Sequence, residues 1–160
     1  MVSSQSEKRA VRVVELYGNI LYRLCVVTLG NEADSQDAVQ ETFIRYINKA
    51  PSFESEEHEK AWLITVAGNI CRDMLRFRLR HPVVDTSFIK DTVSDSEKSY
   101  ILEALVRLPE KYKTVMYLYY VEEYKVEEIA GIIKKSNSAV KMRLSKGREL
   151  LKEIYEREYM

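Results

Sequence analysis

The sequence predicts an all-α protein built from two small helical domains that are joined by a flexible linker. Apolar residues recur at spacings of three and four along most of the 160 residues, as in helices that bury one face. Five glycines and three prolines leave long stretches without a helix breaker. Only residues 82–99 interrupt the pattern, with no helical period and many Asp, Ser and Thr. A segment of this length is typical of a linker or a functional loop, so we place the domain boundary there.

Three helices are expected in the first domain, residues 8–81. The first covers about 8–30, ends at Gly30 and Asn31, and has an apolar face made of Val11, Val14, Leu21, Leu24 and Val27. The second covers about 34–50, and its apolar side consists of Val39, Phe43, Tyr46 and Ile47. The third runs over about 60–80 and ends before Pro82.

The second domain, residues 100–157, has the parts of a helix-turn-helix. Two shorter helical segments, separated by Pro109, come before VEEIAGIIKK, the turn SNS and AVKMRLSKGRELLKEI. Ser136 is suited to cap the last helix, because its hydroxyl can accept a hydrogen bond from a free N–H of the first turn. The last helix carries one apolar stripe at spacings of three and four: Val140, Leu144, Gly147, Leu151 and Ile154.

The basic charge of this last helix indicates nucleic-acid binding. The chain as a whole is neutral, with 25 basic and 25 acidic residues. Between Lys134 and Lys152, however, seven Lys or Arg side chains stand against one acid, Glu149. A solvated helix usually interleaves Glu with Lys at four-residue spacing. A helix that buries one side and presents cations on the other is suited to a major groove.

The first domain offers two further polar surfaces, each with an alternative explanation. Asp37, Gln40 and Glu41 share one helix face, which suits a basic protein partner but is also commonplace for acids near a helix start. Asn69 stands on an apolar helix, where it either reads a base or bonds a neighbouring helix. Gly68 costs that helix about 1 kcal/mol relative to alanine, which indicates close packing or close approach of nucleic acid.

Catalysis and cofactor binding are not expected. Cys25 and Cys71 are far apart in the chain and fit reduced, buried thiols of a cytoplasmic protein. His58 and His81 have no partners at metal-ligand spacing, and neither a nucleophile–base pair nor a Gly-rich phosphate loop is visible. No segment has the apolar length of a signal peptide or a membrane span. We therefore expect a cytoplasmic protein with no enzymatic activity, no metal and no cofactor.

Taken together, the two halves resemble the bacterial RNA polymerase sigma factors of the extracytoplasmic-function (ECF) group. The resemblance is carried by DSQDAVQETFIRYI, AWLITVAGNICRDMLR and LVRLPEKYKTVMYLYYVEEYKVEEIAGIIKKSNSAVKMRLSKGRELL, in this order and spacing. It implies sigma region 2 over residues 8–81, a linker over 82–99 that runs through the polymerase cleft, and sigma region 4 over 100–157. The protein would then bind core polymerase, direct promoter recognition and assist DNA melting.

The resemblance also implies roles for single residues. Those placed on the β′ clamp helices of the polymerase are Asp37, Gln40 and Glu41. Those placed at the minus-ten element are Asn69, Arg72 and Arg76. Those placed at the minus-thirty-five element are Ser138, Lys141, Met142, Arg143, Ser145, Lys146 and Arg148. The polymerase β flap is a further partner, and so is an anti-sigma factor, which in such proteins is often membrane-bound and clamps between the domains.

The acidic segment 54–59 is among the departures from the family pattern, and two other functions are compatible with parts of the sequence. Residues 54–59 carry four Glu where relatives often have Gly, Ser and Arg, which argues against base capture by this loop. A stand-alone helix-turn-helix regulator would bind an operator without polymerase, but would leave Asp37, Glu41 and Asn69 without a purpose. A helical protein-interaction module would need no basic helix at all.

Overall fold

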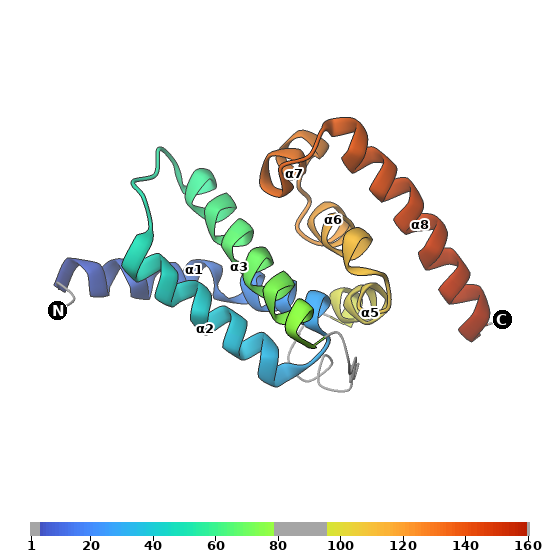
Figure 1. The fold of residues 1–160 in the computed structure, drawn as a ribbon, viewed down its shortest axis with the longest axis horizontal. Helices are drawn as coiled ribbons and strands as arrows, with labels where there is room; N and C mark the ends of the chain where they lie inside the picture. The colour runs from blue at the N-terminus through green and yellow to red at the C-terminus, as the bar shows by residue number, and fades with distance from the viewer. Residues whose placement is uncertain (1–3, 79–95, 160) are drawn as a thin grey trace.

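The computed structural model describes residues 4–78 and 96–159, which form helices without any strand, and the all-α prediction is confirmed. The N-terminal unit contains α1 (Ser4–Leu29), α2 (Glu32–Lys49) and α3 (Glu56–Arg78). The C-terminal unit contains α5 (Ser96–Leu105), α6 (Glu110–Tyr120), α7 (Val126–Ile133) and α8 (Asn137–Tyr159). The two units lie side by side, and α8 is on the outer edge (Figure 1). Most of the predicted linker 82–99 is outside the described residues, and α5 begins within it.

In the N-terminal unit, α1 packs along both α2 and α3. Gly30 ends α1 at a positive φ of 72°, a conformation that suits glycine, and its N–H donates to the Val26 carbonyl. Asn31 then caps α2, its side-chain oxygen accepting from the backbone N–H of Asp34 at 2.8 Å. The short turn folds α2 back against α1, and α3 closes the three-helix unit (Figure 1).

Three residues that the sequence pattern placed on buried faces are exposed. Val11 and Val14 are 57% and 46% exposed, whereas Val13, Tyr17 and Leu21 are buried. Successive residues of a helix are rotated by about 100°, so a stripe misjudged by one position turns a side chain out of the core. Ile47 is 42% exposed for the same reason, because the neighbouring Tyr46 occupies the buried position.

A buried carboxylate joins all three helices of this unit. Glu59, only 4% exposed, accepts hydrogen bonds from Arg12 at 3.0 Å and from the Tyr46 hydroxyl at 2.6 Å. Since α3 begins at Glu56, most of the acidic segment 54–59 is the first turn of a helix and not a loop. Part of its charge therefore has a structural role that the sequence did not reveal.

The C-terminal unit contains the predicted helix-turn-helix. Lys134 ends α7 in the left-handed conformation, and the Ser136 hydroxyl accepts from the backbone N–H of Ala139 at 3.1 Å, as predicted for the cap of α8. Gly147 allows α8 to lie close to α6, because a β-carbon there would come within 2.9 Å of the Met116 side chain. The buried Val140 and Leu144 face the same way, so the opposite side of α8 is free for solvent.

The two units pack against each other and share one hydrophobic core. Arg23 of α1 forms an ion pair with Glu122, which follows α6, at 2.9 Å, and both side chains are largely buried. The Tyr117 hydroxyl donates to the Ile20 carbonyl at 3.0 Å and also bonds Glu122 at 2.7 Å. This packing is between segments about a hundred residues apart in the chain, so periodicity could not predict it.

Candidate functional site

The exposed side of α8 is the basic surface that the sequence predicted. Val140, Leu144 and Gly147 are buried beneath it, and Met142 at its crest is 72% exposed. The other predicted residues with exposed side chains are Ser138, Lys141, Ser145, Lys146 and Arg148. Six of the seven predicted minus-thirty-five residues thus share a solvent-facing surface. The seventh, Arg143, is half-buried.

Some cations of α8 already have partners. Lys146 lies 3.7 Å from the carboxylate of Glu149, one turn further along the helix, and both side chains are about half exposed. Arg148 donates to the Tyr120 hydroxyl at 3.0 Å. An exposed ion pair of this kind contributes about 0–1 kcal/mol, so Lys146 can exchange Glu149 for a phosphate at little cost. Lys141 is exposed on the same surface.

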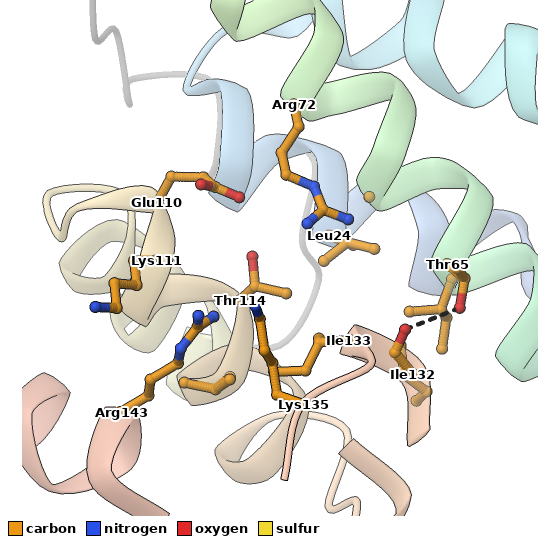
Figure 2. Close-up of a pocket in the computed structure, with 13 residues that line it drawn as sticks. Leu24, Thr65, Arg72, Glu110, Lys111, Thr114, Ile132, Ile133, Lys135 and Arg143 are labelled. Carbon is orange, nitrogen blue, oxygen red and sulfur yellow. Dashed lines mark hydrogen bonds between the residues drawn. The ribbon is translucent and has the colours of Figure 1, made fainter. Parts of the chain in front are cut away.

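Arg143 faces a cleft of about 210 Å³ between the two units, and Arg72 of α3 faces it from the other side. Figure 2 shows the two guanidinium groups directed into this hollow from opposite walls, with Thr114 between them. Lys111, Lys135 and Glu110 also line the cleft. The packed arrangement therefore brings one predicted minus-ten residue and one predicted minus-thirty-five residue to the same cleft, which the sequence could not indicate.

The predicted minus-ten residues are exposed along the outer part of α3. Asn69 accepts a hydrogen bond from Arg72 one turn later, while Arg76 lies 3.9 Å from Asp73 in an exposed pair. The Asn69 side chain thus bonds within its own helix rather than to a neighbouring one. A β-carbon at Gly68 would meet nothing within 4 Å, so close packing inside the protein does not explain that glycine.

The predicted polymerase-binding residues lie on the side of α2 that faces solvent. Asp37 and Gln40 are exposed, and Glu41 is half-buried beside Arg45, with 3.3 Å between Glu41 Oε1 and Arg45 Nε. Sequence reasoning missed Ile44, which is 44% exposed next to Gln40 and Glu41. Its spacing of four and three from these two residues was the available signal.

An apolar groove between α5, α6 and α8 was also missed. It has a volume of about 410 Å³, its floor is almost free of polar atoms, and Arg148 and Lys152 stand at its rim. The apolar side chains that form it are Ile101, Leu105, Met116, Tyr120, Leu151 and Tyr155. The sequence signal was the apolar stripe of α8, because Leu151 of that stripe lines the groove.

Two buried groups, Lys113 and Cys25, have pKa values that their surroundings shift. Burial lowers the pKa of Lys113 from 10.5 to about 8, with a partly opposing effect from Glu110. Cys25 and Cys71 are both free and buried, as predicted. The hydrogen bond with Cys71 and burial raise the pKa of the Cys25 thiol. Within residues 4–78 and 96–159, no cluster of His, Cys, Asp and Glu could hold a metal.

Both units match known protein families, and these matches settle the affiliation of the chain. Residues 13–81 match Sigma-70 region 2, and residues 98–151 match Sigma-70, region 4. The chain is 31% identical to the ECF RNA polymerase sigma factor SigW of Bacillus subtilis (strain 168), over 88% of this chain and 85% of SigW. The chain belongs to the ECF group of RNA polymerase sigma factors. SigV of the same organism is 30% identical, over 82% of this chain and 81% of SigV.

Two solved structures share the fold of this ECF sigma factor. CnrH, solved with the cytosolic domain of CnrY, has a TM-score of 0.72 at 20% identity, over 98% of this chain and 96% of CnrH. RpoE of Bartonella quintana, solved with the anti-sigma factor NepR, has a TM-score of 0.72 at 21% identity, over 94% of this chain and 99% of RpoE.

The resemblance that the sequence indicated is confirmed, and the protein is an alternative RNA polymerase sigma factor. Neither the stand-alone regulator nor the interaction module is favoured. The boundaries 8–81, 82–99 and 100–157 and the roles of single residues remain predictions. No helix in the parts of the chain described here is long and apolar enough to cross a membrane.

Proposed function

We propose that this ECF sigma factor uses residues of three helices: those of α2 for core RNA polymerase, those of α3 for the minus-ten element and those of α8 for the minus-thirty-five element. The observation that carries the proposal is the basic surface of α8, where buried apolar residues hold a helix whose outer side exposes cations. We further propose that the protein acts in the cytoplasm, where its polymerase works, and that it catalyses no reaction itself.

The α2 surface suits a basic protein partner and not DNA. Asp37, Gln40 and Glu41 provide acceptors and negative charge, while the exposed Ile44 and Ile47 add apolar area beside them. Polar groups with an apolar centre are the usual composition of a protein–protein contact. The β′ clamp helices of the polymerase are the partner that the family relationship supports.

The α3 surface suits a single strand with an unstacked base. Asn69 carries both donors and acceptors for a base edge, and the exposed Arg72 and Arg76 lie one and two turns further along, within reach of the backbone phosphates. Trp62 lies half-buried earlier on the same helix and offers an aromatic ring near the strand. The α8 surface suits duplex DNA, with Lys141, Arg143 and Lys146 for guanine edges and phosphates.

The apolar groove of the C-terminal unit suits an amphipathic helix. Helix-in-groove binding requires a long apolar trough with a charged rim, and Arg148 and Lys152 favour an acidic occupant. We assign it to the β flap of the polymerase. An anti-sigma factor, the kind of partner solved with RpoE of Bartonella quintana, is the alternative occupant.

In-vitro transcription from a pool of genomic fragments tests the proposed function. Core polymerase with and without this protein is incubated with the pool, and the transcript starts are sequenced. Starts that require the protein and share two spaced upstream elements support the proposal. Starts that do not depend on the protein, together with specific fragment binding by the protein alone, indicate an operator-binding regulator instead.

Two variants separate the surfaces. Lys141→Ala is expected to weaken transcription from promoters with a good minus-thirty-five element at least fivefold and to leave polymerase affinity unchanged. Asp37→Lys is expected to lower polymerase affinity and all transcripts equally. Glu153→Gln is the matched control, because Glu153 is exposed on α8 beyond the basic surface. Equal losses at every promoter for Lys141→Ala would contradict its assignment to DNA.

A further inference from the structure

The cleft that Arg72 and Arg143 share gathers basic side chains from four separate elements. Arg72 comes from α3, Lys111 from α6, Lys135 from the turn between α7 and α8, and Arg143 from α8. Among the described residues that line the cleft, Glu110 is the single acid. Cations so far apart in the chain are not the charged face of one solvated helix, and the function proposed above gives Lys111 and Lys135 no role.

These cations converge without carboxylate partners. Within residues 4–78 and 96–159, no ion pair joins Arg72, Lys135 or Arg143 to an acid. Arg72 donates one N–H to the Asn69 side chain, which leaves the other donors of its guanidinium available. Arg143 is half-buried, so water solvates its charge only in part. Like charges that converge repel one another, and an anion between them would replace that repulsion by attraction.

The directions of the side chains suit phosphate groups. Figure 2 shows the Arg72 and Arg143 guanidinium groups directed into the hollow from opposite walls, and the Lys135 side chain extending toward Thr114 between them. Lys111 points outward at the edge. A planar guanidinium binds two phosphate oxygens through parallel N–H bonds, whereas an ammonium acts as a point charge. Two guanidinium groups on opposite walls therefore favour an anion that presents oxygens on both sides.

The base of the cleft is apolar, and a contact between the units closes one end. Leu24, Ile64 and Val115 line the cleft and are themselves buried. The Thr65 hydroxyl lies 3.3 Å from the Ile132 carbonyl oxygen, a hydrogen bond drawn in Figure 2. Apolar surroundings strengthen the attraction between a cation and an anion, because they lower the local dielectric constant. A cleft that is already formed also costs less to occupy than one that the ligand has to assemble.

The size of the cleft limits the kind of anion. Its volume of about 210 Å³ is the space of about seven water molecules, at about 30 Å³ each. A di- or triphosphate group fits a space of this size, whereas a DNA duplex is far too wide. The cleft is therefore a different site from the outer surface of α8, although Arg143 is a member of both.

We propose that this cleft binds an oligophosphate, with its phosphate groups held between Arg72 of α3 and Arg143 of α8 and with Lys135 as a third cation. The ligand is a free di- or triphosphate or the phosphate chain of a nucleotide, because the cations recognise the same group in both. The inference goes beyond the function proposed above, since neither polymerase binding nor promoter binding requires a small anion between the units.

Isothermal titration calorimetry of the full chain, without divalent cations, measures binding of sodium diphosphate and sodium triphosphate. ATP and GTP test whether a nucleoside adds affinity. Sulfate at the same ionic strength tests for a general response to negative charge, and a short oligothymidylate tests for a single strand of nucleic acid. Arg72→Gln, Arg143→Gln and Lys135→Gln each remove one cation of the cleft and keep a polar side chain. Lys49→Gln, which removes an exposed cation at the end of α2, is the matched control.

Diphosphate is expected to bind with one-to-one stoichiometry and at least tenfold more tightly than sulfate. Arg72→Gln and Arg143→Gln are each expected to weaken this binding at least tenfold and Lys135→Gln at least threefold, whereas Lys49→Gln leaves it unchanged. Equal affinities of triphosphate and the nucleotides would support a free oligophosphate as the ligand, and tighter binding of a nucleotide would support the nucleotide.

Four results would overturn the inference: no saturable binding of any phosphate or nucleotide, equal binding of sulfate, cleft variants that bind like Lys49→Gln, or binding of the oligothymidylate alone. The last result would instead make the cleft part of the path of a nucleic-acid strand. Promoter-specific starts in the transcription assay test the proposed function separately, so either idea can fail while the other stands.

Discussion

Replacing Glu59 by alanine removes the acceptor at which α1, α2 and α3 meet. Arg12 and Tyr46 both donate to this carboxylate, and the Glu59 side chain is only 5% exposed. The variant leaves the Tyr46 hydroxyl buried without its partner, since the Tyr46 side chain lies in the core. Arg12, with 43% of its side chain exposed, can turn to water instead.

The two donors contribute unequally to the expected loss. A buried hydrogen bond to a charged group is worth about 1.5–3 kcal/mol, and this value applies to the 2.6 Å bond from Tyr46. The ion pair with the half-exposed Arg12 adds about 0–1 kcal/mol, because water screens it. Glu59→Ala is therefore expected to lower the free energy of unfolding by about 2–4 kcal/mol.

Urea denaturation followed by circular dichroism measures this loss, with Glu57→Ala as the control. Glu57 is exposed two residues before Glu59 on the same helix, so its removal is expected to lower the free energy of unfolding by less than about 0.5 kcal/mol. Tyr46→Phe and the double variant complete a cycle, whose coupling energy is expected to reach about 1 kcal/mol or more. A loss below about 1 kcal/mol for Glu59→Ala, or a coupling energy near zero, would refute the assignment of a structural role to Glu59.

Three further predictions concern α3, α6 and α8. Gly147→Ala forces the Met116 side chain to move and is expected to lower the free energy of unfolding by about 1–3 kcal/mol, measured by thermal or urea denaturation. An unchanged stability would show that the Met116 side chain can move aside without a loss of packing energy. A β-carbon at Gly68 meets no other atom, so Gly68→Ala is expected to stabilise α3 by up to about 1 kcal/mol. The same variant is expected to weaken promoter opening, measured by permanganate footprinting. Promoter opening equal to that of the unaltered chain would exclude close approach of nucleic acid to Gly68. Lys113→Met is expected to stabilise the fold by about 1–3 kcal/mol at pH 7. Burial lowers the pKa of Lys113 from 10.5 to about 8, so as pH rises the folded state loses this proton before the unfolded state does. The destabilisation caused by burying the charged Lys113 is therefore full below about pH 8 and decreases as pH rises toward 10.5. An equal gain from Lys113→Met at pH 7 and pH 9.5 in urea titrations would contradict that pKa.

The α8 surface could be predicted from sequence because a single helix determines it. Val140, Leu144 and Gly147 fix which side is buried, and the cations follow from their positions on the helical wheel. On α1 the same reasoning failed for Val11 and Val14, because more than one apolar stripe fits that helix and only the contacts with α2 and α3 choose between them. Contacts between distant segments leave no local pattern at all.

The ion pair between Arg23 and Glu122 is the clearest case of such a contact. Arg23 on α1 and Glu122 after α6 each look like ordinary surface residues in the sequence, and 99 positions separate them. Their charges cancel in the composition of a chain with 25 bases and 25 acids, so the neutral total conceals how the charge is arranged. In space, the bases are exposed on α8, and a group of acids lies against α3.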